Sequence, residues 1–504
     1  VFVLLSLLGM MAALIADKMR PGMVLFSVVV LFLCVGILTP KEMLEGFSNK
    51  GMITVALLFL VSEGIRRTGT LGQVIKKLLP QGKTTVFKAQ LRILPSVAFI
   101  SAFLNNTPVV VIFAPIIKHW AKSVKLPATK FLIPLSYVTI LGGICTLIGT
   151  STNLVVHGMI LEAGYEGFTM FELGKVGIFI AIAGIIYLFI FSKRLLPDAR
   201  PDTAVPDEEV EEGEKLHRVE AVLGARFPGI NKKLSDFNFQ RHYGAEVKEI
   251  KTRNGQRYVD HLEDVVLREG DTLVVMADDT FIPTWGESSV FVLLTNGNDP
   301  DTSGKKKRWL ALILLVLMIV GATVGELPAT KEMFPDIKLD MFFFVCITTI
   351  IMAWTNIFPA RKYTKYISWD ILITIACAFA ISKAMVNSGV ADCVAGFIIG
   401  LSDDYGPHVL LAILFVITNL FTELITNNAA AALAFPLALS ISAQLGVSPT
   451  PFFVVICMAA SASFSTPIGY QTNLIVQGIG NYKFTDFVRI GLPLNIITFL
   501  ISVI

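Results

Sequence analysis

Two short polar stretches interrupt apolar sequence and carry side chains suited to binding ions. The first is Asn105-Asn106-Thr107 within LNNTP, and the second is Thr426-Asn427-Asn428 within LITNNAA. Hydrocarbon cannot satisfy these amides and hydroxyls, so they belong where protein or a water-filled cavity surrounds them. A helix that begins at such a stretch adds unpaired N–H groups, which favour an anion. We expect the two stretches to be the tips of broken helices that share one anion site.

Two further segments share a pattern that contains glycine, threonine and asparagine. GTSTNLVVHG at 149–158 and GYQTNLIVQG at 469–478 are identical at six of ten positions, with an offset of 469 − 149 = 320. At an offset of 321, Asn106 matches Asn427. The spacing from tip asparagine to segment asparagine is 153 − 106 = 47 in the first half and 473 − 427 = 46 in the second. We interpret this as an internal repeat, with a helix break at each glycine segment.

These breaks predict cation chemistry beside the anion site. Carbonyl groups of unwound segments and amide oxygens suit a hard cation such as Na⁺. Neither tip contains lysine or arginine, so an anion held by neutral donors beside bound cations is released when the cations leave. The alternative is that these polar groups only form hydrogen bonds between helices. Their recurrence at matched spacing in four clusters favours a site.

The composition indicates a polytopic α-helical membrane protein. The chain is 54% hydrophobic and 16% charged, with a mean hydropathy of +0.68, whereas ordinary globular domains have about 25% charged residues. Apolar segments suited to spanning a bilayer lie near 2–16, 22–38, 52–65, 131–157, 173–192, 309–326, 340–358, 369–386, 451–478 and from 486 onward. The broken regions 90–117 and 408–440 are predicted to be re-entrant hairpins. The net charge of +3 does not suggest a nucleic-acid partner.

The chain divides into a first membrane repeat (1–196), a linker and soluble insert (197–307), and a second membrane repeat (308–504). The insert opens with the acidic linker PDARPDTAVPDEEVEEGEK. Asn254-Gly255 is typical of a hairpin turn, and Gly270-Asp271 predicts a tight turn before a strand. KKLSDF is predicted to be a short helix, so the insert is a small α+β domain.

Basic residues orient the chain in the membrane. They gather after the third span, in KKKR at 305–308 and after residue 360, whereas the 158–172 loop has three glutamates and no lysine or arginine. By the positive-inside rule, the insert is cytoplasmic and the two halves begin from opposite sides. The predicted fold class is therefore a polytopic α-helical protein of two inverted repeats, each with a re-entrant hairpin and a broken helix, plus a small α+β cytoplasmic insert.

With these motifs the chain resembles the divalent anion/sodium symporter family, the carriers of dicarboxylates, citrate and sulfate. The resemblance lies in LNNTPVVVIFAP, GGICTLIGTSTN, FTELITNNAAAALAFP and STPIGYQTN. Asn105 stands where the family has serine, and Ser151-Thr152 and Gln471-Thr472 stand where it has two prolines. Sulfate or another small divalent oxyanion is therefore expected at least as much as a dicarboxylate.

The resemblance implies a set of site residues. Substrate contacts would be Asn105, Asn106, Thr107, Thr150, Thr426, Asn427 and Asn428. Two sodium sites would use Ser101, Asn105, Asn106, Gly149 and Asn153 in the first half, and Thr422, Ile425, Asn427, Gly469 and Asn473 in the second. Ser101 and Thr422 are repeat equivalents one turn before each tip, which supports that pair independently. The family also implies an elevator-type homodimer in a bacterial-type inner (plasma) membrane, with Na⁺ as coupling ion and no other cofactor.

The insert resembles the TrkA-C (RCK-C) domain over LSDFNFQRHYGAEVKEIKTRNGQ and LREGDTLVVMAD. Related domains bind nucleotides or cyclic dinucleotides in some transporters, but this insert has no glycine-rich phosphate loop. A scaffold or dimer-stabilising role is expected, and ligand-regulated gating is the alternative.

Other functions have weaker support. No Ser/His/Asp or Cys/His set is spaced for catalysis, so an enzyme is not expected, and the six cysteines all lie in apolar segments as packing residues. The alternative function is a cation/proton antiporter of related architecture. An ion channel would need a TVGYG-type selectivity loop, which the sequence lacks. Glu423, beside the second tip, is a candidate for orienting that hairpin.

Overall fold

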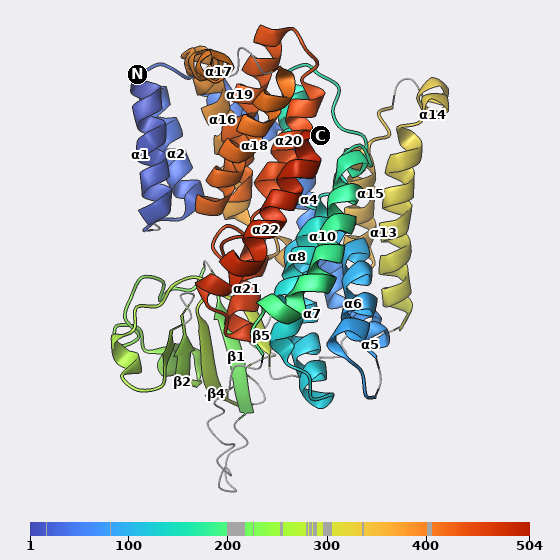
Figure 1. The fold of residues 1–504 in the computed structure, drawn as a ribbon, viewed down its shortest axis with the longest axis vertical. Helices are drawn as coiled ribbons and strands as arrows, with labels where there is room; N and C mark the ends of the chain where they lie inside the picture. The colour runs from blue at the N-terminus through green and yellow to red at the C-terminus, as the bar shows by residue number, and fades with distance from the viewer. Residues whose placement is uncertain are drawn as a thin grey trace, which may run out of the picture.

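The protein is predominantly helical, with one small sheet at one end (Figure 1). The computed structural model describes the whole chain except residues 17, 81, 199–216, 225, 253–255, 279–280, 282–284, 286–289, 296–304, 335–336 and 401–405. Seven of the described helices are long and apolar enough to cross a membrane. This confirms the prediction of a polytopic helical membrane protein.

The helices before the insert are α1 Phe2–Ala16, α2 Pro21–Cys34, α3 Pro40–Glu45, α4 Lys50–Arg67, α5 Thr70–Leu78, α6 Val86–Ser101, α7 Asn106–Ser123, α8 Leu132–Gly143, α9 Ser151–Glu162 and α10 Gly174–Leu195. Those after it are α13 Lys305–Gly325, α14 Pro328–Met333, α15 Met341–Trp354, α16 Trp369–Asn387, α17 Val390–Gly400, α18 Pro407–Leu424, α19 Asn427–Leu445, α20 Thr450–Ser461, α21 Gln471–Gly480 and α22 Phe484–Val503. Short 3-10 helices cover Gly46–Ser48, Ala128–Lys130, Leu262–Asp264 and Ala360–Lys365.

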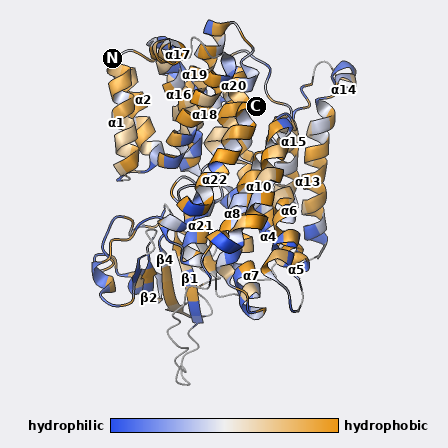
Figure 2. Cartoon of the chain, in the orientation of Figure 1, coloured by the Kyte–Doolittle hydropathy of each residue, from blue (hydrophilic) through white to orange (hydrophobic). Residues whose placement is uncertain are grey.

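Apolar side chains face outward on the long helices, as expected for a chain that lies in lipid. On α10, Ile178, Phe179, Ile182, Ile186 and Ile190 are all exposed, and hydrophobic residues dominate the helical part of the molecule (Figure 2). A soluble protein rarely exposes such a continuous apolar surface. Lipid tails therefore cover this apolar surface.

Two helical hairpins and two interrupted helices build the centre of the molecule. The short turns after α6 and α18 reverse the chain into α7 and α19, and both turns fall at the predicted polar tips. Helix α8 stops at Gly143 and α9 starts at Ser151, while α20 stops at Ser461 and α21 starts at Gln471. The chain thus breaks at both predicted segments.

The insert folds into an antiparallel sheet in the order β3-β2-β4-β1-β5. Its strands are β1 His217–Leu223, β2 Glu246–Lys251, β3 Arg257–Tyr258, β4 Thr272–Ala277 and β5 Phe291–Thr295, with the short helix α11 Phe239–Tyr243. An aromatic cluster that includes Phe227, Phe237 and Tyr243 forms its core. The insert therefore has a hydrophobic core of its own.

Local predictions for the insert were correct at two places and wrong at one. Strands β2 and β3 pair as a hairpin, with Lys251 opposite Arg257, although the Asn254-Gly255 turn lies outside the described residues. Gly270, with φ +84, makes the tight turn before β4. KKLSDF is not a helix, because Lys233 forms a β-bridge with Val266. The short helix begins later, where the Asn238 side chain accepts a hydrogen bond from the Arg241 N–H.

Candidate functional site

Each hairpin tip is fixed by a hydroxyl group one turn before it. The Ser101 hydroxyl donates to Asn106 Oδ1 (2.8 Å) and contacts the Thr139 carbonyl (2.9 Å). At the second tip, the Thr422 hydroxyl lies 2.7 Å from Asn427 Oδ1 and 2.5 Å from the Ala460 carbonyl. The same two contacts thus recur at equivalent positions of the second half. They hold each tip asparagine with its amide N–H₂ group turned away from its own hairpin.

The asparagine after each helix break closes the unwound segment. Asn153 Nδ2 donates to the carbonyls of Thr146 (2.8 Å) and Gly143 (3.4 Å). At the equivalent position of the second half, Asn473 Nδ2 donates to the carbonyls of Thr466 (3.2 Å) and Ser463 (2.8 Å). Both asparagines are fully buried. Their amides satisfy carbonyl groups that an interrupted helix leaves without partners.

Contacts between the halves bring all four polar segments together. Asn106 of the first tip donates through Nδ2 to the Tyr470 hydroxyl (2.5 Å), which also lies 3.2 Å from the Thr150 hydroxyl. Thr107 donates weakly to Gln471 Oε1 (3.3 Å). The first tip therefore faces the second break.

The second tip faces the first break in return. Asn428 Oδ1 accepts from the Thr152 hydroxyl (3.1 Å) and the Ser151 hydroxyl (3.3 Å). The Asn427 side chain also interacts with the Tyr470 hydroxyl, so this phenol contacts both tip asparagines. The two hairpins and two breaks thus form one buried, mainly neutral hydrogen-bonded cluster.

Glycine permits the close approach of backbone at each break. A Cβ on Gly149 would lie 2.5 Å from the Gly143 carbonyl oxygen, and one on Gly469 would lie 2.5 Å from the Thr422 carbonyl oxygen. These distances are far inside van der Waals contact. The predicted Gly149 and Gly469 are therefore needed for packing as well as for any role of their carbonyls.

The remaining predicted residues lie beside this cluster. Asn105 lines a small cavity of about 10 Å³ with Ser62, Ile148 and Ser151. Thr426 has a buried hydroxyl without a hydrogen-bond partner among the described residues. Ile425 is buried, and its backbone N–H bonds to the Phe421 carbonyl (2.8 Å). Of the predicted site residues in this group, Thr426 therefore has a hydroxyl whose hydrogen-bonding capacity is not used by any described residue.

Glu423 connects the second hairpin to the second break, as its position beside the tip suggested. Its carboxylate accepts from the backbone N–H groups of Ser465 and Thr466, both at 2.9 Å, and from Asn495 Nδ2 at 2.8 Å. Bonds to a charged acceptor are stronger than neutral ones. These contacts support the predicted orienting role of Glu423, although it lies outside the cluster of tip contacts.

Tyr470 and Gln471 were not predicted as site residues. They occupy the positions in the second half that are equivalent to Thr150 and Ser151, and both reach the first tip. The prediction of Thr150 was not carried across the repeated pattern, because Tyr470 and Gln471 differ in type from Thr150 and Ser151. The signal that would have found them is position within the repeat, because equivalent positions face equivalent partners.

The fold and this central polar cluster are those of a membrane transporter, and comparison with known proteins agrees. The chain matches the family model described as citrate transporter over residues 11–440 and 337–504. It is 30% identical to an uncharacterized transporter of Synechocystis over 93% of this chain and 90% of that protein. The chain belongs to the citrate transporter family.

Two other relatives extend this comparison. The uncharacterized transporter YfbS of Escherichia coli is 26% identical over 99% of this chain and 97% of its own length. Sodium/sulfate cotransporter 2 of Chlamydomonas reinhardtii is 30% identical over 56% of this chain, which corresponds to 31% of that protein. The similarity thus covers both whole-length and partial relatives.

Proposed function

We propose that this protein is a sodium-coupled symporter that moves a divalent anion, a sulfate-like oxyanion or a dicarboxylate, by an elevator-type motion. The observation that carries the proposal is that the tip of each hairpin lies against the broken helix of the other half, through neutral amides and hydroxyls. The name of the sodium/sulfate cotransporter relative supports both the ion and the anion. Na⁺ serves as coupling ion.

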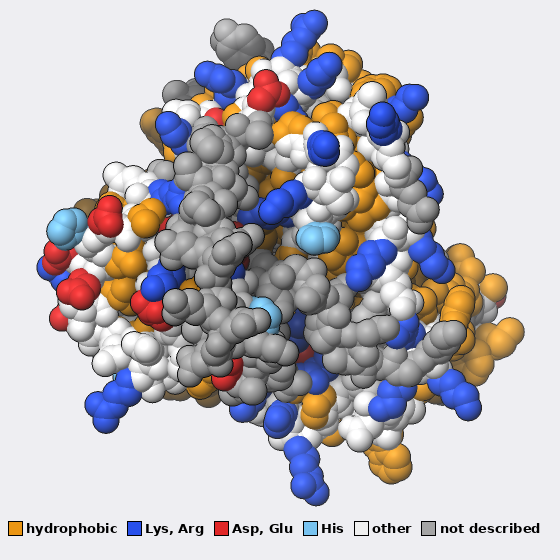
Figure 3. All heavy atoms as spheres, turned by 90° about the horizontal axis from the view of Figure 1, so that it is seen from below, with side chains coloured by type: hydrophobic (Ala, Val, Ile, Leu, Met, Phe, Trp, Pro, Cys, Tyr) orange, Lys and Arg blue, Asp and Glu red, His pale blue; other side chains and the backbone are white. Residues whose placement is uncertain are grey.

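The two halves act as inverted repeats, 1–196 and 308–504, around the insert. Support comes from the matching hydrogen bonds of Ser101 with those of Thr422, and of Asn153 with those of Asn473, at equivalent positions of the two halves. The face that carries the insert shows many lysine and arginine side chains (Figure 3), which favours the cytoplasmic side for it. Broken helices at a repeat interface near the bilayer midplane are a common plan for transporter sites.

The anion is held by helix N-termini and neutral side chains. Helices α7, α9, α19 and α21 all begin within the cluster, and their first N–H groups favour negative charge. The substrate contacts are Asn105, Asn106, Thr107, Thr150, Thr426, Asn427 and Asn428. Because no arginine or lysine takes part, co-bound cations balance the charge of the anion. This requirement couples binding of the anion to binding of Na⁺.

Sodium is held by oxygen atoms that close each tip onto its own break. The first site uses Ser101, Asn105, Asn106, Gly149 and Asn153, and the second uses Thr422, Ile425, Asn427, Gly469 and Asn473. The hydroxyls of Ser101 and Thr422 already touch the amide oxygen of their tip asparagine. Oxygen atoms are the ligands that hard cations prefer, and Na⁺ is a hard cation.

The insert is a TrkA-C-like cytoplasmic domain, and the protein works as a homodimer in the lipid bilayer. The antiparallel sheet in the order β3-β2-β4-β1-β5 is consistent with a small regulatory domain of this kind. A scaffold role is favoured over binding of a nucleotide or cyclic dinucleotide, because no phosphate-binding glycine loop precedes a helix in the described insert.

The proposal is tested with purified protein in liposomes. Uptake of labelled sulfate or succinate should require an inward Na⁺ gradient and stop when Na⁺ is replaced by choline. If no anion enters under either a Na⁺ or a proton gradient, the symport proposal is wrong. A pH change inside the vesicles on adding Na⁺, without any anion, would instead identify a cation/proton antiporter.

A further inference from the structure

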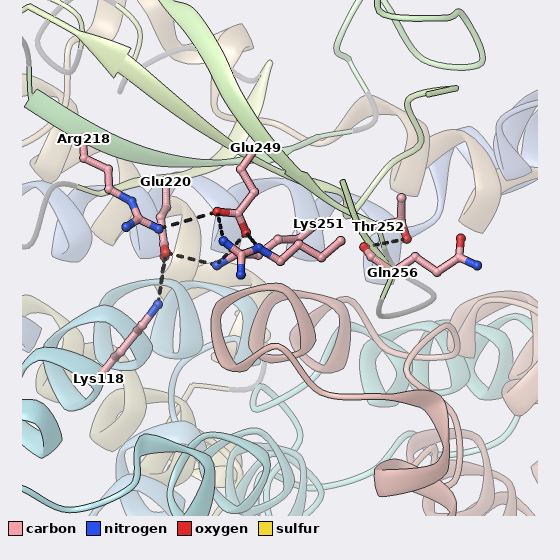
Figure 4. A network of polar contacts seen from close by, with 8 residues as sticks. Lys118, Arg218, Glu220, Glu249, Lys251, Thr252 and Gln256 are labelled. Carbon is pink, nitrogen blue, oxygen red and sulfur yellow. Dashed lines mark hydrogen bonds and ion pairs between the residues drawn. The ribbon is translucent and has the colours of Figure 1, made fainter. Parts of the chain in front are cut away.

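The insert contacts the site-bearing helix α7 through a charged network on its sheet. Lys118, near the end of α7, lies 3.1 and 3.2 Å from the two carboxylate oxygens of Glu220 on β1. Glu220 also pairs with Lys251 (3.5 Å), and Lys251 approaches Glu249 at 3.9 Å (Figure 4). Burial would raise the pKa of Glu220, but Lys118 and Lys251 outweigh it and hold that pKa below its usual range. The carboxylate is therefore charged, and Lys118 joins α7 to the sheet.

A second contact joins the insert to α21. Gly270, in the tight turn before β4, packs against Leu474, and a Cβ on Gly478 would overlap the Thr272 hydroxyl. That hydroxyl is buried and has no hydrogen-bond partner among the described residues. This contact therefore consists of close packing between α21 and the residues at the start of β4, without a hydrogen bond from the Thr272 hydroxyl.

The same close approach exists at the matching position of the first half. A Cβ on Gly158 of α9 would overlap Asn49 Oδ1, and Asn49 Nδ2 donates to the Gly158 carbonyl (3.3 Å). Gly158 and Gly478 are equivalent in the repeated pattern. Asn49 belongs to the membrane part, at the start of α4. The insert thus packs on Gly478 of α21 in the same way that Asn49, at the start of α4, packs on Gly158 of α9.

A third contact joins the insert to the segment that leads into α16. Arg226 Nη2 donates to the Ile367 carbonyl (3.3 Å), just before α16 begins. Its guanidinium also attracts Asp370 in the first turn of α16. One small domain therefore contacts α7, α21 and the segment just before α16.

We propose that the insert is a strap that restrains α7 and α21 relative to α16, and so slows movement of the candidate site. A contact that exists in one conformation and must break in another lowers the rate of the change between them. Breaking either end of the strap should therefore speed transport. The strap goes beyond the symport proposal, and part of its test does not depend on transport.

The first test removes charge at each end. Lys118→Met and Arg226→Met remove the charge and keep an unbranched apolar side chain. Each should raise the initial rate of anion uptake about threefold, the effect that a partly exposed ion pair can supply. Lys122→Met is the matched control, since Lys122 is exposed on the same helix and pairs with no described residue of the insert. If Lys118→Met leaves uptake unchanged, its contact restrains nothing and the strap is refuted.

The second test uses packing and a compensating change. Gly478→Ala should push the turn away and speed uptake, and adding Thr272→Ala should restore the wild-type rate because it removes the overlapping hydroxyl. Failure of Thr272→Ala to restore the rate would show that Gly478→Ala acts within α21 alone and would overturn this contact as an end of the strap.

A structural readout separates the strap from the symport proposal. In protein without substrate, amides of residues 217–223 and 471–480 should exchange hydrogen several-fold faster in Lys118→Met than in the wild type or Lys122→Met, because local opening sets exchange. Unchanged exchange in both segments would refute the strap even if transport is confirmed. Faster exchange would support it even if the transported solute proves to be different.

Discussion

The tip asparagines Asn106 and Asn427 each use the side-chain amide in two directions. The oxygen accepts from a hydroxyl one turn earlier, and the amide of Asn106 reaches across to Tyr470. Asparagine is suited to this because one planar group carries both an acceptor and donors. Removing the side-chain amide therefore removes both contacts at once.

Asn106→Ala and Asn427→Ala are expected to abolish Na⁺-dependent anion uptake, because each removes a tip contact and a proposed ligand at the same time. Uptake into liposomes is the measurement, and size-exclusion profiles check that the variants remain folded. Ser6→Ala is a control, since its hydroxyl bonds within α1. Substantial uptake by either asparagine variant would contradict the proposed site.

Tyr470→Phe tests the phenol that joins the two halves. This hydroxyl contacts Asn106, Thr150 and Asn427, and each hydrogen bond is worth about 1 kcal/mol, so uptake should fall about tenfold or more while the protein stays folded. Tyr187→Phe is the control, since its hydroxyl bonds to the Ile490 carbonyl (3.0 Å) away from the tips. Equal effects of the two changes would show that the Tyr470 hydroxyl contributes no more to transport than an ordinary structural hydrogen bond.

At the scale of elements, each break depends on the helix it faces as well as on its own sequence. The loop after α20 donates two backbone hydrogen bonds to the Glu423 carboxylate, which belongs to α18. Asn495 of α22 binds the same carboxylate. Three elements distant in sequence thus fix the geometry of one unwound segment.

Glu423→Gln should lower the melting temperature by several degrees, because it replaces charge-assisted hydrogen bonds with weaker neutral ones. Uptake should fall as well, since the second break would lose its fixed position. Thermal unfolding in detergent measures the first effect. Glu45→Gln, on the short helix α3, is the comparison, because no residue of that helix is buried. An unchanged melting temperature in Glu423→Gln would show that the carboxylate does not hold the break.

Gly469→Ala should lower the stability and the transport activity of the protein more than most glycine substitutions. The new Cβ would lie 2.5 Å from the Thr422 carbonyl oxygen, which is backbone and cannot move aside. We expect loss of uptake and a lower melting temperature. Gly9→Ala is the matched control, because a Cβ there meets nothing within 4 Å. Tolerance of Gly469→Ala would mean that the break relaxes more than this geometry allows.

For the whole molecule, the neutral character of the site predicts that the anion and Na⁺ stabilise the protein together. A ligand that binds only the folded state adds stability by mass action, about 2.7 kcal/mol at a hundredfold excess over its dissociation constant. Sulfate or succinate should therefore raise the melting temperature in NaCl and fail to do so in choline chloride. A shift of equal size in both salts would contradict coupling between anion binding and Na⁺ binding.

Much of the fold and part of the site could be predicted from sequence alone. Apolar runs predicted the helices, and polar residues within them predicted the breaks, because hydrocarbon leaves such residues few alternatives. Tyr470 could not be predicted in this way because its contact with Asn106 joins opposite halves of the chain. KKLSDF was mistaken for a helix because its β-bridge to Val266 is a tertiary contact.

The sequence by itself determined where the chain breaks and which polar groups stand at each break. Only the tertiary structure decided that the first tip meets the second break and the second tip the first, and that the insert reaches α7, α21 and the start of α16 at once. The reason is physical: burial and helix propensity are encoded locally, whereas the partner of a polar group depends on how distant segments pack together.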